Sequence, residues 1–139
     1  DSEVETLLAS RASGVAPPQF NVAQLLIGVP AAAGEAELAQ RRALAELCER
    51  HDILILEDDP YGKLRFEGEP LPGLFEIAGP ERVLFTSSFS KTVAPGLRVG
   101  YMVAPADLSA RLAAAAGRTY ISPALLAEGA IHQLVTGGH

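Results

Sequence analysis

Lys91 lies in a stretch of the sequence that combines an amine with hydroxyl and guanidinium groups. Ser88 and Ser90 precede it, and Arg98 follows seven residues later, after a Pro-Gly pair typical of a turn. A lysine amine forms a Schiff base with a carbonyl compound, and an arginine beside hydroxyls can hold a phosphate group. The stretch therefore predicts a site for a phosphorylated ligand that reacts with an amine.

A second polar cluster follows the apolar run 53–56, where Asp58 and Tyr61 stand three residues apart. Lys91 and its neighbours likewise follow an expected strand, 83–87, which begins with three apolar residues and ends in hydroxyls. Short apolar runs of this kind are typical of buried strands, and ligands of open α/β sheets bind beyond the carboxyl ends of their strands. We therefore expect the carboxylate, phenol, amine, hydroxyl and guanidinium groups to converge on one pocket.

Pyridoxal phosphate is a cofactor that needs this combination of groups. It needs an amine for its aldehyde, a carboxylate for its ring nitrogen, a donor near its phenolic oxygen and a cationic phosphate site. A carboxylate such as Asp58 keeps the ring nitrogen protonated, so that the ring can accept electrons from the α-carbon of a substrate. Arg98 suits the phosphate, because a guanidinium can bind two oxygens at once. The residues thus favour pyridoxal phosphate.

Three motifs resemble those of the fold-type I pyridoxal-phosphate aminotransferases. Residues 58–62 read Asp-Asp-Pro-Tyr-Gly, residues 88–91 read Ser-Phe-Ser-Lys, and residues 95–100 read Pro-Gly-Leu-Arg-Val-Gly. The motifs occur in the order and at the spacing of that family. The likeness is greatest to the branch that holds 2-aminoadipate and kynurenine aminotransferases and the aminotransferase-like domains of MocR regulators.

The resemblance implies a role for each residue of the two clusters. Lys91 would form the Schiff base and shuttle the α-proton, which makes it the candidate catalytic residue. Asp58 would pair with the pyridine nitrogen, and Tyr61 would hydrogen-bond the phenolic oxygen. The phosphate would be held by Ser88, Ser90 and Arg98.

Each of these residues also has a structural interpretation. Lys91 taken alone would be an ordinary surface lysine, and Asp58 or Asp59 would be a turn or cap residue. The remaining alternatives are packing for Tyr61, strand termination for Ser88 and Ser90, and a surface ion pair for Arg98. We assign no catalytic role to the histidines and no metal ligands.

One motif of the family is altered in this sequence. The family usually has Asn-Pro-Thr-Gly after the strand that corresponds to the apolar run 24–29, whereas residues 31–33 are alanines and only Gly34 remains. Alanine cannot replace the asparagine that donates to the phenolic oxygen of the cofactor. Two interpretations follow: the chain is part of a longer protein that completes the site, or it is a shortened domain that no longer catalyses.

Strands and helices alternate along the sequence, and most of the strands are apolar throughout. This pattern predicts an α/β fold, a three-layer sandwich with a mainly parallel sheet. By resemblance, residues 1–139 form part of the large, cofactor-binding domain of an aminotransferase. The expected strands are 24–29, 53–56, 83–87 and 98–104, with a short extended piece at 64–66. The expected helices are 3–11, 35–50, 106–116 with Gly117 as its C-cap, and 124–135, with one helical turn at 74–77.

The composition is that of an ordinary globular domain. The chain has 139 residues, a net charge of −6 and a single cysteine, Cys48. The acidic balance argues against nucleic-acid contact by this segment, and one cysteine cannot form an internal disulfide. No apolar run is long enough for a membrane span. We therefore expect a cytoplasmic domain without contact to a membrane.

The resemblance implies an aminotransferase that moves an amino group between an amino acid and a 2-oxo acid in the complete protein. Fold-type I enzymes are generally dimers, so it also implies a homo-oligomer. Two other functions remain open: the effector-sensing domain of a MocR-type regulator, and a non-catalytic structural domain in a larger assembly. For the chain alone we expect weak cofactor binding and little turnover.

Overall fold

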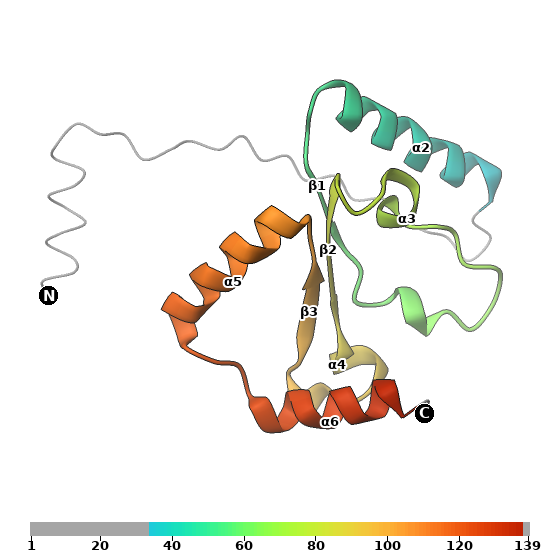
Figure 1. Ribbon diagram of the computed structural model, residues 1–139. Coiled ribbons are helices and arrows are strands. Elements are labelled where there is room, and N and C mark those ends of the chain that lie inside the picture. The colour runs from blue at the N-terminus through green and yellow to red at the C-terminus, as the bar shows by residue number, and fades with distance from the viewer. Residues whose placement is uncertain (1–33, 138–139) are drawn as a thin grey trace, which may run out of the picture.

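The computed structural model describes residues 34–137. The helix expected at 3–11, the strand expected at 24–29 and the alanines at 31–33 lie outside this range. Within it, a three-stranded sheet carries helices on both sides. Figure 1 shows the helices α2 (Glu35–Arg50) and α3 (Leu74–Ala78) on one side of the sheet and α5 (Ala106–Tyr120) on the other. The expected α/β class and layering are confirmed.

The sheet consists of the strands β1 (Ile55–Asp58), β2 (Val83–Ser88) and β3 (Gly100–Val103), in that order. β1 and β2 are parallel, whereas β2 and β3 are antiparallel. The described sheet is therefore mixed rather than mainly parallel. The connections explain this, because the long crossover from β1 to β2 contains α3, whereas a short segment joins β2 to β3 and only reverses the chain.

The main hydrophobic core lies between the sheet and the two helices α2 and α3. Val83 is fully buried there, and the rings of Phe75 on α3 and Phe85 on β2 have their centroids 5.7 Å apart. α2 contributes Ala45 and Cys48 to this core. The free cysteine is thus buried, as its place in an apolar helical pattern predicted.

Several element boundaries differ from those expected. β1 begins at Ile55, where pairing with Val83 of β2 begins, and not at Ile53. The piece at 64–66 is not a strand, because a 3-10 helix occupies Gly62–Leu64. A single helical turn, α4 (Phe89–Thr92), and a 3-10 helix at Pro95–Leu97 connect β2 to β3.

The two C-terminal helices follow β3. α5 continues past Gly117 and ends at Tyr120, so the expected C-cap at Gly117 is wrong. A glycine inside a helix costs only about 1 kcal/mol relative to alanine, and the helix stops instead where Ile121 turns to a φ of 65°. α6 (Leu125–Thr136) agrees with the expected helix to within one residue at each end.

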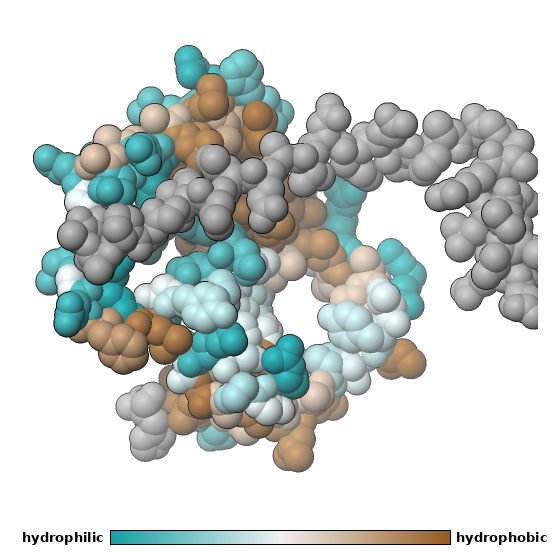
Figure 2. Space-filling view, turned by 180° about the vertical axis from the view of Figure 1, so that it is seen from behind, coloured by the Kyte–Doolittle hydropathy of each residue, from teal (hydrophilic) through white to brown (hydrophobic). Residues whose placement is uncertain are grey.

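The strands are less buried than their apolar sequences predicted. On β1, Leu56 is 66% exposed, and on β3, Met102 is 51% exposed. Apolar residues reach the surface in several places in the space-filling view (Figure 2). No helix within residues 34–137 has the length and apolar character needed to cross a membrane.

Candidate cofactor site

The chemically active residues gather at the carboxyl ends of β1 and β2. Asp58 is the last residue of β1, Ser88 is the last residue of β2, and Lys91 lies in α4 directly after β2. Because β1 and β2 are parallel, these ends meet at the same edge of the sheet. The structure thus brings the two polar clusters of the sequence to one place.

Asp58 and Asp59 have different surroundings. The Asp58 side chain is exposed, and its Oδ1 accepts a hydrogen bond of 2.7 Å from the Thr86 hydroxyl. The Asp59 carboxylate stabilises the turn after β1. Its Oδ1 accepts hydrogen bonds from the backbone N–H groups of Tyr61 at 3.3 Å and Gly62 at 2.7 Å. A Cβ at Gly62 would collide with Asp59 Oδ2, which explains the glycine. Asp59 therefore has the turn role, and Asp58 remains available to a ligand.

Tyr61 and Lys91 face each other across the site. The Lys91 Nζ atom lies 5.4 Å from the centroid of the Tyr61 ring, within the range of a cation–π contact. Tyr61 is 58% exposed, so it is not a buried packing aromatic. The phenol and the amine are therefore both accessible and close enough to contact one ligand.

Hydrogen bonds link the three expected phosphate-binding residues, Ser88, Ser90 and Arg98. The Ser88 hydroxyl accepts the Ser90 N–H at 3.1 Å and thereby caps α4. The Arg98 Nη1 donates to Ser90 Oγ at 3.3 Å, and Ser90 itself is buried. Within residues 34–137 the one salt bridge joins Arg82 to Asp52, so Arg98 has no acidic partner there.

Arg98 also borders a hollow of about 220 Å³ at the junction of α5 and α6. Tyr120 and Glu128 line the same hollow. Arg98 has a left-handed backbone, with a φ of 53°, directly after the 3-10 turn at Pro95–Leu97. This conformation reverses the chain, and its side chain reaches back to Ser90.

Two polar residues of the strands, Thr86 and Glu57, had no role predicted from the sequence. Thr86 lies opposite Asp58 in the β1–β2 register and donates to it. Glu57 points to the other face, where its two carboxylate oxygens accept the N–H groups of Leu74 and Phe75 at 2.8 Å each. Strand alternation could have indicated that Glu57 and Asp58 face opposite ways, but their partners depend on the strand register.

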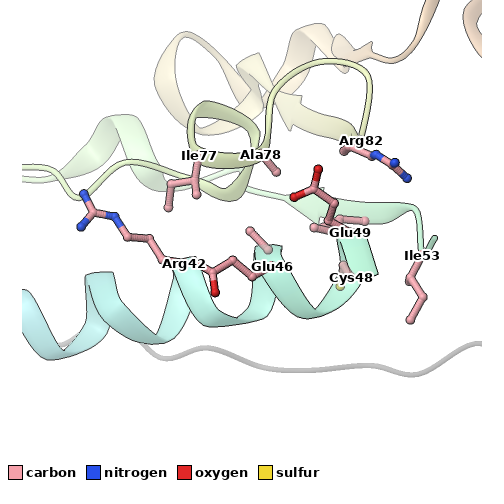
Figure 3. Close-up of a pocket in the computed structure, with 10 residues that line it drawn as sticks. Arg42, Glu46, Cys48, Glu49, Ile53, Ile77, Ala78 and Arg82 are labelled. Atoms are coloured by element: carbon pink, nitrogen blue, oxygen red, sulfur yellow. The ribbon is translucent and has the colours of Figure 1, made fainter. Parts of the chain in front are cut away.

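A larger groove lies elsewhere in the described part of the chain. It has a volume of about 450 Å³ between α2, α3 and the start of β1, at the amino ends of the strands. Figure 3 shows Arg42, Glu46 and Glu49 along α2, with Ile77 and Ala78 of α3 opposite them. None of the residues with cofactor chemistry lines it. The groove is therefore distinct from the candidate site.

Comparison with known proteins identifies the family. Residues 34–136 match the family model described as aminotransferase class I and II. This match covers more than half of the chain, and the chain belongs to that family.

Relatives of two kinds are similar to this chain. The mitochondrial kynurenine/alpha-aminoadipate aminotransferase of Bos taurus is 31% identical over 122 residues, which are 85% of this chain and 29% of that protein. The probable rhizopine catabolism regulatory protein MocR of Rhizobium meliloti is 32% identical over 102 residues, 73% of this chain and 21% of that protein. The chain thus spans less than a third of the length of either relative.

A solved structure supports the fold and the cofactor. LysN, an alpha-aminoadipate aminotransferase from Thermus thermophilus, matches with a TM-score of 0.67 and 32% identity, over 73% of this chain and 27% of that one. It was crystallised with N-(5'-phosphopyridoxyl)-L-leucine. Together with the family match, this similarity indicates pyridoxal phosphate as the cofactor.

Proposed function

We propose that the chain supplies the Schiff-base lysine and part of the cofactor pocket of a pyridoxal-phosphate aminotransferase. In the complete protein this enzyme would transfer an amino group between an amino acid and a 2-oxo acid. The observation that carries the proposal is the position of Lys91, whose amine faces Tyr61 at the sheet edge that also holds Asp58. Membership of the aminotransferase family supports the same conclusion.

The donor set fits the cofactor group by group. Asp58 offers a carboxylate to the ring nitrogen, Tyr61 a phenol to the phenolic oxygen, and Lys91 an amine to the aldehyde. Arg98 is a cation without an acidic partner in the described range, and it already contacts the Ser90 hydroxyl. This pair, with the Ser88 hydroxyl beside it, would hold the phosphate.

When bound, pyridoxal phosphate supplies an electron-withdrawing ring that stabilises negative charge on the α-carbon of an amino acid. The chain's own residues do the remaining work. Lys91 would hold the cofactor through its Nζ atom, and its free amine would act as the base that takes up the α-proton of the amino acid and returns the same proton to the bound substrate. The negative charge of Asp58 would keep the ring nitrogen protonated. The Tyr61 hydroxyl would orient the ring.

A titration with pyridoxal phosphate tests this proposal. The chain has two lysines, Lys63 and Lys91, and Lys63 lies exposed in the turn after Tyr61. In the full natural polypeptide, Lys91→Ala should abolish the visible absorption band of the attached cofactor, whereas Lys63→Ala should keep it. Addition of amino acids should then shift the band of the wild type. A band that survives in Lys91→Ala would remove Lys91 from the proposed role.

An effector-sensing domain is a second candidate, because the MocR protein of Rhizobium meliloti is similar over 73% of this chain. The site residues are the same in both proposals, and release of product separates them. An enzyme turns over a mixture of an amino acid and a 2-oxo acid many times. A sensor binds the amino acid and changes its spectrum, without producing more than one equivalent of the new amino acid.

The alanines at 31–33 favour a third candidate, a non-catalytic domain. Such a domain would retain neither cofactor attachment nor turnover in the full natural polypeptide.

We also propose that the protein is cytoplasmic and forms a homodimer. The dimer is supported by apolar side chains such as Leu126, 91% exposed, which lie open on the described surface. Light scattering on the full polypeptide would give its mass, and a monomer with an intact cofactor band would exclude the dimer.

A further inference from the structure

We propose that Thr86 is a positioning residue, which holds the Asp58 carboxylate in place for the ring nitrogen of the cofactor. This inference rests on the role proposed above for Asp58. It adds a residue that none of the three sequence motifs contains, because Thr86 lies inside β2, before the Ser-Phe-Ser-Lys motif.

The strand register places Thr86 beside Asp58. The two residues are Cα partners in the parallel β1–β2 pair, so their side chains stand on the same face of the sheet. Thr86 contacts the end of β1 twice: its carbonyl accepts the N–H of Asp59 at 2.9 Å, and its hydroxyl donates to Asp58 Oδ1 at 2.7 Å. One residue therefore fixes both the backbone after Asp58 and the Asp58 side chain.

The Thr86 hydroxyl has one proton and two acceptors within reach. The carbonyl oxygen of Glu57 lies 3.4 Å away, whereas Asp58 Oδ1 lies 2.7 Å away and belongs to a carboxylate. The shorter hydrogen bond to the charged acceptor is the stronger one. The proton therefore points to Asp58, and the carbonyl contact is secondary.

This hydrogen bond leaves one carboxylate oxygen for the ligand. Among the described residues, Thr86 provides the one side-chain donor to Asp58, and Oδ2 accepts no hydrogen bond. The other nearby hydroxyl, that of Ser87, donates to the Asp59 carbonyl at 2.8 Å. Because Asp58 is exposed at the end of its strand, its side chain would otherwise rotate freely. Thr86 therefore selects the orientation in which Oδ2 is free for the ring nitrogen.

The test removes the hydroxyl while keeping the shape of the side chain. In the full natural polypeptide, Thr86→Val should weaken the affinity for pyridoxal phosphate about tenfold, the loss expected for one hydrogen bond to a charged group. Thr86→Ser retains the hydroxyl and should bind within about twofold of the wild type, which is inside the scatter of a side-chain change without a lost hydrogen bond. Thr119→Val removes a hydroxyl that bonds only within α5, and it should leave the affinity unchanged.

A double-mutant cycle shows whether Thr86 acts through Asp58. In an Asp58→Ala background the Thr86→Val substitution should have no further effect on the cofactor dissociation constant, because the partner is gone. A purely structural role would weaken binding equally in both backgrounds and would overturn the inference. Wild-type affinity in the single Thr86→Val variant would overturn it as well. If Thr86→Val does not fold, Thr86→Ala takes its place in the cycle.

The failure of this inference is distinguishable from that of the proposed function. If Asp58→Ala weakens cofactor binding and Thr86→Val does not, Asp58 keeps its role and only the positioning by Thr86 is wrong. If Asp58→Ala itself binds the cofactor as tightly as the wild type, with the same absorption spectrum, the proposed role of Asp58 is wrong. Both variants are compared at equal folded fraction, measured by circular dichroism.

Discussion

Glu57 and Asp58 are adjacent carboxylates on β1 that point to opposite faces of the sheet. Glu57 faces the side covered by α2 and α3, where it accepts the first two N–H groups of α3. Asp58 faces the opposite side, toward α5, which we call the open face because α5 has no buried residue and Leu56 beside Asp58 is largely exposed. A single hydroxyl contacts Asp58 there. On the covered face, both carboxylate oxygens of Glu57 accept hydrogen bonds from the protein. On the open face, Asp58 Oδ2 has no hydrogen-bond partner among the described residues and is free for a ligand.

The apolar neighbours of these residues show the same difference. Ile55 is partly buried on the covered face and lies opposite the fully buried Val83. Leu56, on the open face, is 66% exposed. The covered face is thus a packed core that gives the strands their positions. The open face carries the groups with chemistry, and their low burial is what access by a ligand requires.

The largest effect is expected in the core of the covered face. Leu74 is 8% exposed, and Leu74→Ala should lower the free energy of unfolding by about 2–5 kcal/mol through lost burial and a residual cavity. Leu56→Ala, on the open face, is the matched control and should cost much less. Urea denaturation followed by circular dichroism measures both. Equal losses would mean that the two faces are packed alike.

Substitutions of the adjacent carboxylates Glu57 and Asp58 should have different effects: the first should lower the stability of the fold, and the second should weaken cofactor binding. Glu57→Gln keeps one acceptor but loses the charge that bonds two N–H groups, and should cost about 1.5–3 kcal/mol of stability. Asp58→Asn should change stability by less than about 0.5 kcal/mol, as an exposed substitution does, but should weaken cofactor binding. The measurements are urea denaturation and a cofactor titration. A Glu57→Gln variant of full stability would contradict the anchoring of α3.

The rim of the covered face should contribute less. The Arg82–Asp52 salt bridge is 2.7 Å long, but the Asp52 side chain is 93% exposed. Solvent and salt screen such a pair, so Arg82→Ala should cost less than about 1 kcal/mol. The loss should shrink further when denaturation is repeated in about 1 M salt, where the screening length is about 3 Å. A loss of stability as large as that of Glu57→Gln would contradict the expectation that solvent screens the Arg82–Asp52 pair.

The smallest effect is expected at the start of α2, the helix that covers the core. The Gly34 N–H donates to Glu37 Oε2 at 2.8 Å, and this hydrogen bond lowers the pKa of Glu37 below its ordinary value. Because the pKa of Glu37 is lower in the folded state, the contact stabilises the helix at pH values above the ordinary pKa of a glutamate. This contribution is lost as the pH falls through the lowered pKa. NMR of the Glu37 carboxyl should show this titration. An ordinary pKa would contradict the capping contact.

The sequence predicted the elements that depend on local pattern. The bounds of α2 follow from its amphipathic repeat, and the structure has the same bounds, 35–50. The start of β1 could not be predicted, because the apolar run begins at Ile53 whereas pairing with β2 begins at Ile55. The direction of β3 depends on the short connection through α4. The end of α5 depends on Ile121 rather than on the more flexible Gly117.

The candidate site divides in the same way. The groups that the motifs name can be found from the sequence, since residue type and spacing carry the resemblance. The structure brings Asp58, Tyr61 and Lys91 to one sheet edge. The contacts that support these groups cannot be predicted from the sequence. Thr86 reaches Asp58 through strand register, and Glu57 reaches α3 across 17 residues of sequence. Contacts between segments that are distant in the sequence can be identified only once the fold is known.

The most direct measurement of the central claim is the location of the covalently attached cofactor. The full natural polypeptide is incubated with pyridoxal phosphate, reduced with borohydride, digested and analysed by mass spectrometry. Lys63 serves as the internal control, because it is exposed and lies in the same sequence region. We predict the phosphopyridoxyl group on Lys91, with Lys63 unlabelled at one equivalent of cofactor. Equal labelling of Lys63 and Lys91, or labelling of Lys63 alone, would contradict the claim.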